Sequence, residues 1–226
     1  MHEPKIELIP IRNALRSDGP TILDVLVRII PPTPEVHFVR PTINLGLVLD
    51  RSGSMSGSKK MAYALEAACF AVEQLLATDR VSVTAFDDQV ETLAPNAPVV
   101  DKAGLIARIR KITPRGVTDL HDGWKEGGRQ VENGLISQGV NRVILLSDGQ
   151  ANHGVTDPNV IAREAVGLSA RGVSTTTMGL GDDYNEDLLQ AMAEAGDGNY
   201  YFIESPQQLA DIFQTVLSGR MYTLRG

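Results

Sequence analysis

Three oxygen-bearing side chains follow a short apolar run at alternate positions. Residues 45–49 read LGLVL, and Asp50, Ser52 and Ser54 come after them. Such a run is typical of a buried parallel strand, which would place a carboxylate and two hydroxyls where the strand ends. Ligands bind at that end of the strands in an open α/β sheet. Oxygen side chains there favour a hard cation such as Mg²⁺ or Ca²⁺ over Zn²⁺, which prefers nitrogen and sulfur.

This D-x-S-x-S pattern resembles the first segment of the metal-ion-dependent adhesion site of von Willebrand factor type A (vWA) domains, and the chain looks like a bacterial member of that family. Thr118, in RGVTDLHDG, matches the threonine of the second segment. Asp148, in VILLSDGQAN, matches the aspartate of the third. The three segments occur in the family's order, and the similarity covers roughly residues 41 to 220.

The resemblance implies a metal site made by Asp50, Ser52, Ser54, Thr118 and Asp148. The two serines would be direct ligands, and the other three residues would act directly or through bridging water. Because the three hydroxyls are neutral, the ion would keep much of its charge and favour an Asp or Glu carboxylate from a partner protein. The expected cofactor is Mg²⁺, with Ca²⁺ or Mn²⁺ as alternatives.

The function implied by this resemblance is that of a divalent-cation-dependent protein-binding module, not an enzyme. Family members serve as adhesion modules, as subunits of metal chelatases and as partners of AAA+ ATPases, and the sequence does not choose among these. A metal that only holds the loops together is the structural alternative. Taken alone, Thr118 and Asp119 would each also suit the capping of the following helix, a role that needs no metal.

A metal-dependent hydrolase or phosphoryl-transfer enzyme that uses Asp50 is the other alternative. The haloacid-dehalogenase type requires a second carboxylate two residues later, where this chain has Ser52. A P-loop requires the pattern G-x-x-x-x-G-K-[ST], and Gly53 and Gly57 are too close together for it. The chain also lacks a G-x-S-x-G elbow, an H-E-x-x-H motif and a C-x-x-C motif. These patterns favour a binding module over an enzyme.

Other titratable side chains stand in predicted loops. His121 and His153 are interpreted as surface or capping residues, because neither has a known catalytic spacing. Asp87 and Asp88 follow a predicted strand and precede a short antiparallel edge strand at residues 90–93. We interpret the two aspartates as the solvated tip of that hairpin, since Asp is a common turn residue.

Composition limits the expected partners and compartment. The 226 residues are 42% hydrophobic and carry a formal net charge of −7. This acidity argues against nucleic acid and anionic membrane as partners, because a basic face supplies most of that attraction. The first residues lack the charged start and apolar middle of a signal peptide, and no run of about 18 apolar residues occurs. The expectation is therefore a cytoplasmic protein.

The chain is predicted to divide into three parts. Residues 1–40 form an N-terminal β extension with strands at 6–11 and 22–30, a Ser-Asp-Gly turn between them and a Pro-rich break afterwards. The resemblance implies that such strands belong to a β-sandwich, which would be incomplete here. Residues 41–220 alternate strands with helices, which predicts a doubly wound, mostly parallel sheet flanked by helices. Residues 221–226 form a C-terminal tail.

Two helices are expected to follow the predicted metal loops. Met61, Leu65 and Cys69 recur at helical spacing, which predicts an amphipathic helix that ends near Thr78 and buries the cysteine. A second helix is expected to run from the Thr118 loop towards Ile136.

Overall fold

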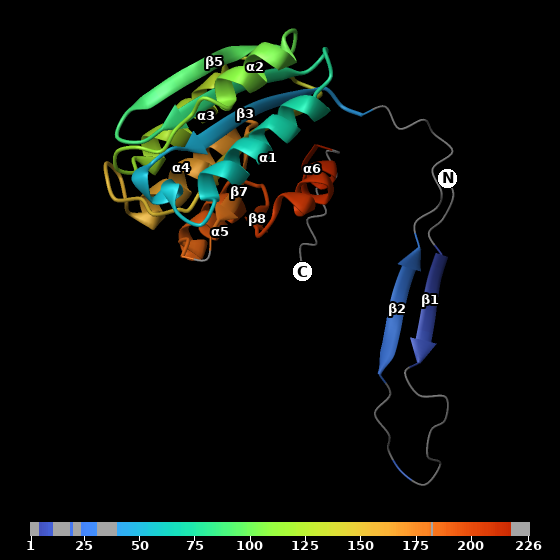
Figure 1. Ribbon diagram of the computed structural model, residues 1–226. Helices are drawn as coiled ribbons and strands as arrows, with labels where there is room; N and C mark the ends of the chain where they lie inside the picture. Colours follow the sequence, from blue (N-terminus) through green and yellow to red (C-terminus); the bar gives the residue numbers. More distant parts are fainter. Residues whose placement is uncertain (1–4, 11–18, 20–23, 31–39, 182, 218–226) are drawn as a thin grey trace. The chain divides into compact units, whose positions relative to one another are not determined.

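The computed structural model describes residues 5–10, 19, 24–30, 40–181 and 183–217 (Figure 1). The chain divides into two compact units, residues 1–39 and residues 40–226. The first unit carries a two-stranded antiparallel sheet, and the second carries a six-stranded sheet with helices. All five predicted metal ligands lie in the second unit.

The six-stranded sheet has the order β5-β4-β3-β6-β7-β8. β5 pairs antiparallel with β4, and the other neighbouring strands pair in parallel. This arrangement confirms the predicted doubly wound, mostly parallel sheet with one antiparallel edge strand. The strands are β3 (Ile43–Asp50), β4 (Arg80–Phe86), β5 (Val90–Pro98), β6 (Val140–Ser147), β7 (Ser174–Leu180) and β8 (Tyr200–Ile203).

Helices cover both faces of this sheet (Figure 1). One apolar cluster joins the sheet to α1, α2 and α6, and a second joins it to α3, α4 and α5. None of the helices in the described ranges is long and apolar enough to cross a membrane. The helices are α1 (Lys60–Gln74), α2 (Lys102–Ile109), α3 (Leu120–Glu132), α4 (Pro158–Ala170), α5 (Glu186–Ala195) and α6 (Leu209–Leu217), with 3-10 helices η1 (Gly53–Ser56) and η2 (Pro206–Gln208).

β3 is buried along its whole length and connects both halves of the core. Leu45, Leu47 and Leu49 belong to the cluster that contains α1, whereas Val48 belongs to the cluster that contains α3. This division follows from the alternation of side chains along a strand. Gly127 of α3 lies against Val48, where an added Cβ would stand 2.1 Å from Val48 Cγ2. The close approach holds α3 beside β3, and the loop before α3 lies beside the loop after β3, because Gly53 N–H donates to the Gly116 carbonyl.

The edge strand β5 is longer than the predicted segment at residues 90–93, because it continues to Pro98. The added part contains Pro95 and Pro98, and an edge strand tolerates proline wherever the missing N–H faces away from the sheet. The pairing of β5 with β4 also shifts register between Val81 and Thr84. The edge position therefore overrides the local signal of the prolines.

α1 ends at Gln74, before the predicted end near Thr78. The Asp79 carboxylate accepts a hydrogen bond of 2.7 Å from Leu76 N–H, which removes that group from the helical pattern. The helix buries the free thiol of Cys69, as predicted, and burial raises the pKa of that thiol.

α3 ends at Glu132 and does not continue towards Ile136. Asn44 Nδ2, on β3, donates hydrogen bonds of 2.8 and 2.9 Å to the carbonyls of Val131 and Gly134. Gly134 N–H also donates to the Val131 carbonyl over 3.0 Å, so a tight turn and a strand side chain together satisfy the end of the helix.

The first unit contains β1 (Lys5–Pro10) and β2 (Val25–Ile30), paired antiparallel with Lys5 opposite Ile30. β1 begins one residue before the predicted segment at 6–11, and β2 covers the second part of the predicted segment at 22–30. The predicted turn at residues 17 and 18, the Pro-rich break at 31–34 and the tail at 221–226 lie outside the described residues.

Candidate metal centre

Asp50 is the last residue of β3, and its side chain is fully buried. Its Oδ1 accepts a hydrogen bond of 2.8 Å from Ser52 N–H, and its Oδ2 accepts one of 2.6 Å from Ser147 Oγ. Burial raises the pKa of Asp50 to about 6, although the hydrogen bonds from Ser147 and Ser52 act in the opposite direction. The chain therefore holds a poorly solvated carboxylate in a fixed orientation, which a nearby cation would stabilise.

Ser52 and Ser54 bring their hydroxyls to the same place. Ser54 lies in η1, which the buried side chain of Met55 anchors to the core, and the two Oγ atoms are 3.1 Å apart. Neighbouring ligands of an octahedral Mg²⁺ with bonds of about 2.1 Å stand about 3.0 Å apart. The two hydroxyls form a hydrogen bond with each other, and their separation is also that of two neighbouring ligands of a small hard cation.

Thr118 is buried in the loop between α2 and α3. Its N–H donates to Asn152 Oδ1 over 2.9 Å, and its carbonyl accepts from the N–H groups of Asn152 and His153. Within the described ranges its hydroxyl has no hydrogen-bond partner. The cap of α3 is Asp119, whose carboxylate accepts from Asp122 N–H, so the Thr118 hydroxyl is not needed as a cap and suits a ligand role.

Asp148 directly follows β6, and its side chain is also fully buried. Its Oδ1 accepts a hydrogen bond of 3.3 Å from Gln150 N–H, and its Oδ2 lies 3.0 Å from Lys60 Nζ. Lys60 Nζ lies 2.6 Å from Asp183 Oδ1 as well. Burial by itself would lower the pKa of Lys60, but the hydrogen bonds to the two aspartates raise it above its ordinary value. This ion pair was not predicted from the sequence.

The profile of the von Willebrand factor type A domain matches residues 44–215 of the chain. The chain belongs to this family. Its sequence is 32% identical over 178 residues to the uncharacterized protein sll0103 of Synechocystis, an alignment that covers 79% of this chain and 41% of that protein. The chain thus spans about two fifths of the length of this relative.

Two solved structures show the same fold. The von Willebrand factor type A structure from Catenulispora acidiphila has a TM-score of 0.66 at 19% identity. That comparison covers 86% of this chain and 44% of the Catenulispora chain. Proximal thread matrix protein 1 of the mussel byssus, solved with a zinc-occupied MIDAS motif, has a TM-score of 0.63 at 22% identity. That comparison covers 79% of this chain and 46% of the mussel chain.

A buried ion-pair cluster beside the metal loop of this vWA domain was not predicted. Asp87 was expected to be solvated at a hairpin tip, and this prediction is wrong because its side chain is fully buried. Its Oδ2 lies 2.5 Å from Arg115 Nε and 3.4 Å from Arg51 Nε. Burial by itself would raise the pKa of Asp87, but the hydrogen bonds from Arg115 and Gln89 hold it below its usual range.

The same cluster connects the first two segments of the vWA site. Arg115 N–H donates to the Arg51 carbonyl over 2.7 Å, and Gly53 N–H donates to the Gly116 carbonyl over 3.1 Å. Arg51, between Asp50 and Ser52, is the sequence feature that could have indicated this cluster. A charged residue directly after a buried strand requires a partner of opposite charge if it is itself buried.

The interpretation of the two histidines as surface or capping residues is wrong for His121, which is buried, whereas His153 is exposed. His121 is buried, and its ring nitrogens contact Asp122 Oδ1 and Glu164 Oε2 at 3.1 and 3.0 Å. His153 Nδ1 contacts Asp119 Oδ2 at 3.1 Å. Both rings are therefore engaged with carboxylates of neighbouring turns.

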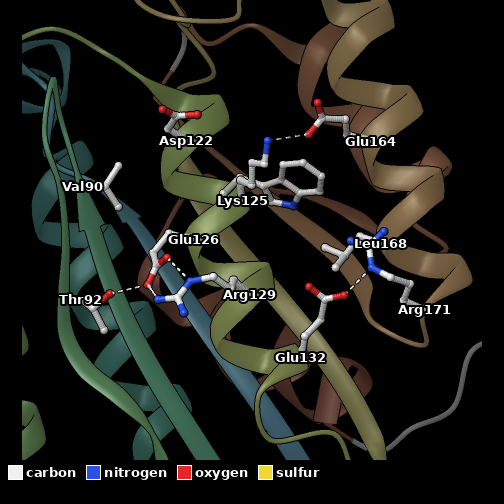
Figure 2. A pocket seen from close by; sticks show the side chains of 11 residues that line it. Val90, Thr92, Asp122, Lys125, Glu126, Arg129, Glu132, Glu164, Leu168 and Arg171 are labelled. Atoms are coloured by element: carbon white, nitrogen blue, oxygen red, sulfur yellow. Dashed lines mark hydrogen bonds and ion pairs between the residues drawn. The ribbon is translucent and has the colours of Figure 1, made fainter.

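A surface cavity of about 580 Å³ lies along α3, between β5 and α4 (Figure 2). Figure 2 shows ion pairs among its charged side chains, such as the contact of Lys125 with Glu164. None of the five predicted ligands lines this cavity. Among the residues with described positions, no group of three or more His, Cys, Asp and Glu side chains could hold a metal. The candidate centre therefore depends on its hydroxyl oxygens.

Proposed function

We propose that this vWA domain is a divalent-cation-dependent protein-binding module that recognises a carboxylate of its partner. The observation that carries the proposal is the pair of hydroxyls of Ser52 and Ser54, 3.1 Å apart, in a loop bonded through Gly53 N–H and the Gly116 carbonyl to the loop of Thr118. Among the described residues the Thr118 hydroxyl has no hydrogen-bond partner. Ser52 and Ser54 would hold Mg²⁺ directly. Thr118, Asp50 and Asp148 would hold it directly or through water.

A bound cation would supply a positive centre that attracts an anionic side chain. The three hydroxyls add no negative charge, so the site would retain an excess of positive charge for an Asp or Glu of the partner. The zinc in the MIDAS motif of the mussel byssus protein supports a metal-binding role for a site of this kind.

A binding role also agrees with the surroundings of Asp50. Both of its carboxylate oxygens accept hydrogen bonds, from Ser52 N–H and from Ser147 Oγ. These bonds fix the orientation of the carboxylate at the end of β3, and each oxygen keeps a second lone pair that can face a bound cation or its water. The proposal is a binding module, not an enzyme.

The first test is a calorimetric titration of chelator-treated protein with Mg²⁺. The parent should show one site, and Asp50→Ala should lose it. Asp88→Ala is the matched control, because Asp88 is an exposed aspartate in the loop after β4. Metal binding by Asp50→Ala with the affinity of the parent would contradict the assignment.

The second test concerns the partner, which is to be captured from native lysate with and without chelator. Capture should fail in chelator and return with Mg²⁺ or Mn²⁺. Thr118→Ala should weaken capture strongly while costing about 1 kcal/mol of stability or less, whereas Thr156→Ala, in an exposed loop, should change neither. Capture that survives both chelation and Thr118→Ala would leave the metal with a structural role.

A further inference from the structure

Lys60 is a buried cation beside the candidate metal centre. It is the first residue of α1, and only 2% of its side chain is exposed. Its ammonium lies 3.0 Å from Asp148 Oδ2 and 2.6 Å from Asp183 Oδ1. Removing an ammonium from water is costly unless it is paired, so this geometry requires both carboxylates.

Several backbone segments pack closely around the Lys60 side chain. Gly181, at the end of β7, has φ +81°, and an added Cβ there would lie 2.3 Å from Lys60 Cε. The adjoining loop is fixed to the end of β6, because Asn185 N–H donates to the Asp148 carbonyl over 2.8 Å. Gln150 Nε2 also donates to the Asp183 carbonyl over 2.8 Å. α1, the end of β6 and the loop before α5 therefore converge on one lysine.

The Lys60 ammonium would affect the binding of any cation that Asp148 holds. A divalent ion near Asp148 would be repelled by Lys60, and at separations of several ångströms inside a protein such repulsion is substantial. We infer that Lys60 is an internal counter-ion of the metal centre, which stabilises the metal-free protein by neutralising Asp148 and thereby lowers the affinity of the site for divalent cations. This inference rests on the proposed function.

A second consequence concerns the partner. With one aspartate already neutralised by Lys60, a bound cation keeps more of its positive charge than it would beside a free carboxylate. The lysine thus lowers metal affinity and at the same time strengthens the attraction for an acidic side chain. A lysine with a purely structural role would act differently, because its loss would loosen the loops and weaken metal binding.

The test compares Lys60→Met with Lys59→Met by calorimetric titration with Mg²⁺. Lys59 precedes Lys60 and is exposed, so its substitution removes the same charge from the chain without touching Asp148. Lys60→Met should bind Mg²⁺ about tenfold more tightly than the parent. Lys59→Met should remain within about threefold of the parent, because exposed charges are screened. Equal or weaker binding by Lys60→Met overturns the inference.

Thermal unfolding in chelator gives a readout that needs no metal. Lys60→Met should unfold at a lower temperature than the parent and than Lys59→Met, and Mg²⁺ should raise its midpoint by more than it raises that of the parent. If Lys60→Met does not fold, Lys60→Gln removes the charge while keeping an N–H donor for Asp148, and should also bind Mg²⁺ more tightly. Absence of binding in the parent and both variants overturns the proposed function with this inference. Equal binding in all of them overturns this inference alone.

Discussion

Ser147 Oγ, at the end of β6, donates a hydrogen bond of 2.6 Å to Asp50 Oδ2, at the end of β3. The two strands are parallel neighbours with Leu49 opposite Leu146, so the next residues along each strand stand side by side. The same hydroxyl accepts a hydrogen bond of 2.8 Å from Gly149 N–H. One serine therefore orients the first aspartate of the vWA site and fixes the turn that carries Asp148.

Ser147→Ala should weaken Mg²⁺ binding and lower the free energy of unfolding. Asp50 Oδ2 and Gly149 N–H would both lose a buried partner, which costs about 1–3 kcal/mol. Ser82→Ala is the matched control, since the described residues offer its buried hydroxyl no hydrogen bond, and it should change stability by less than about 1 kcal/mol. Calorimetry and urea unfolding measure the two effects. Equal stability losses in the two variants would contradict the role given to Ser147.

Gly127→Ala should destabilise the domain strongly. The added methyl would stand 2.1 Å from Val48 Cγ2 and push α3 away from β3, and overpacking of this kind costs about 1–3 kcal/mol. Gly167→Ala, in α4, is the control because its methyl would meet only Arg171 Nη1 at 3.5 Å. That change should stabilise the helix by up to about 1 kcal/mol. Urea unfolding that ranks the two variants in the opposite order would refute the packing argument.

Glu126→Gln should lower stability at neutral pH but not in acid. Figure 2 shows the Glu126 carboxylate between Thr92 and Arg129, and the hydrogen bond from Arg129 is the main cause that lowers its pKa to about 2. A depressed carboxylate pKa stabilises the fold above the unfolded value of 4.5, and the contribution is lost as pH falls towards 2.

At pH 7 the free energy of unfolding of Glu126→Gln should be about 2 kcal/mol lower than that of the parent. The difference is smaller than the full pKa shift implies, because solvent screens part of the interaction with Arg129. Urea unfolding of parent and Glu126→Gln between pH 7 and pH 3 should show the two free energies converging below about pH 4.5. Glu194→Gln, on the exposed side of α5, should change stability by less than about 0.5 kcal/mol at pH 7. A difference between parent and Glu126→Gln that does not depend on pH would exclude the linkage.

Removal of residues 1–39 should leave Mg²⁺ affinity within a few fold of the parent, because the predicted ligands all lie in the second unit. The shortened chain should begin at Arg40, whose guanidinium forms hydrogen bonds with both oxygens of the buried Asp79 carboxylate. A chain that begins at Thr42 would leave that carboxylate without its cation and should be less stable. A chain beginning at Arg40 that folds but does not bind Mg²⁺ would show that the first unit contributes to the site.

The sequence by itself determined the main architecture of the vWA domain and the place of its candidate ligands. Residues 45–49 and 143–146 are apolar runs, and each run lies within a single strand of the fold. They indicate the strands observed as β3 and β6. Polar residues that directly follow two parallel strands of one sheet lie at the same end of that sheet, where the carboxyl ends of the strands meet. The resemblance to vWA domains assigned Asp50 and Asp148 to one site, and the parallel pairing of β3 with β6 brings the ends of their strands together.

Only the tertiary structure decided which charges meet at that edge. Lys60 contacts a carboxylate 88 residues away, and Asp87 contacts Arg115 at a separation of 28 residues. Local periodicity cannot reveal such pairs, because strand order and register bring their partners together. A turn former such as Asp87 is solvated by default, and it is buried here because two arginines from other segments compensate its charge. The same holds for Lys60. The local sequence pattern indicates only that it starts a helix, and the tertiary structure makes it the counter-ion of Asp148.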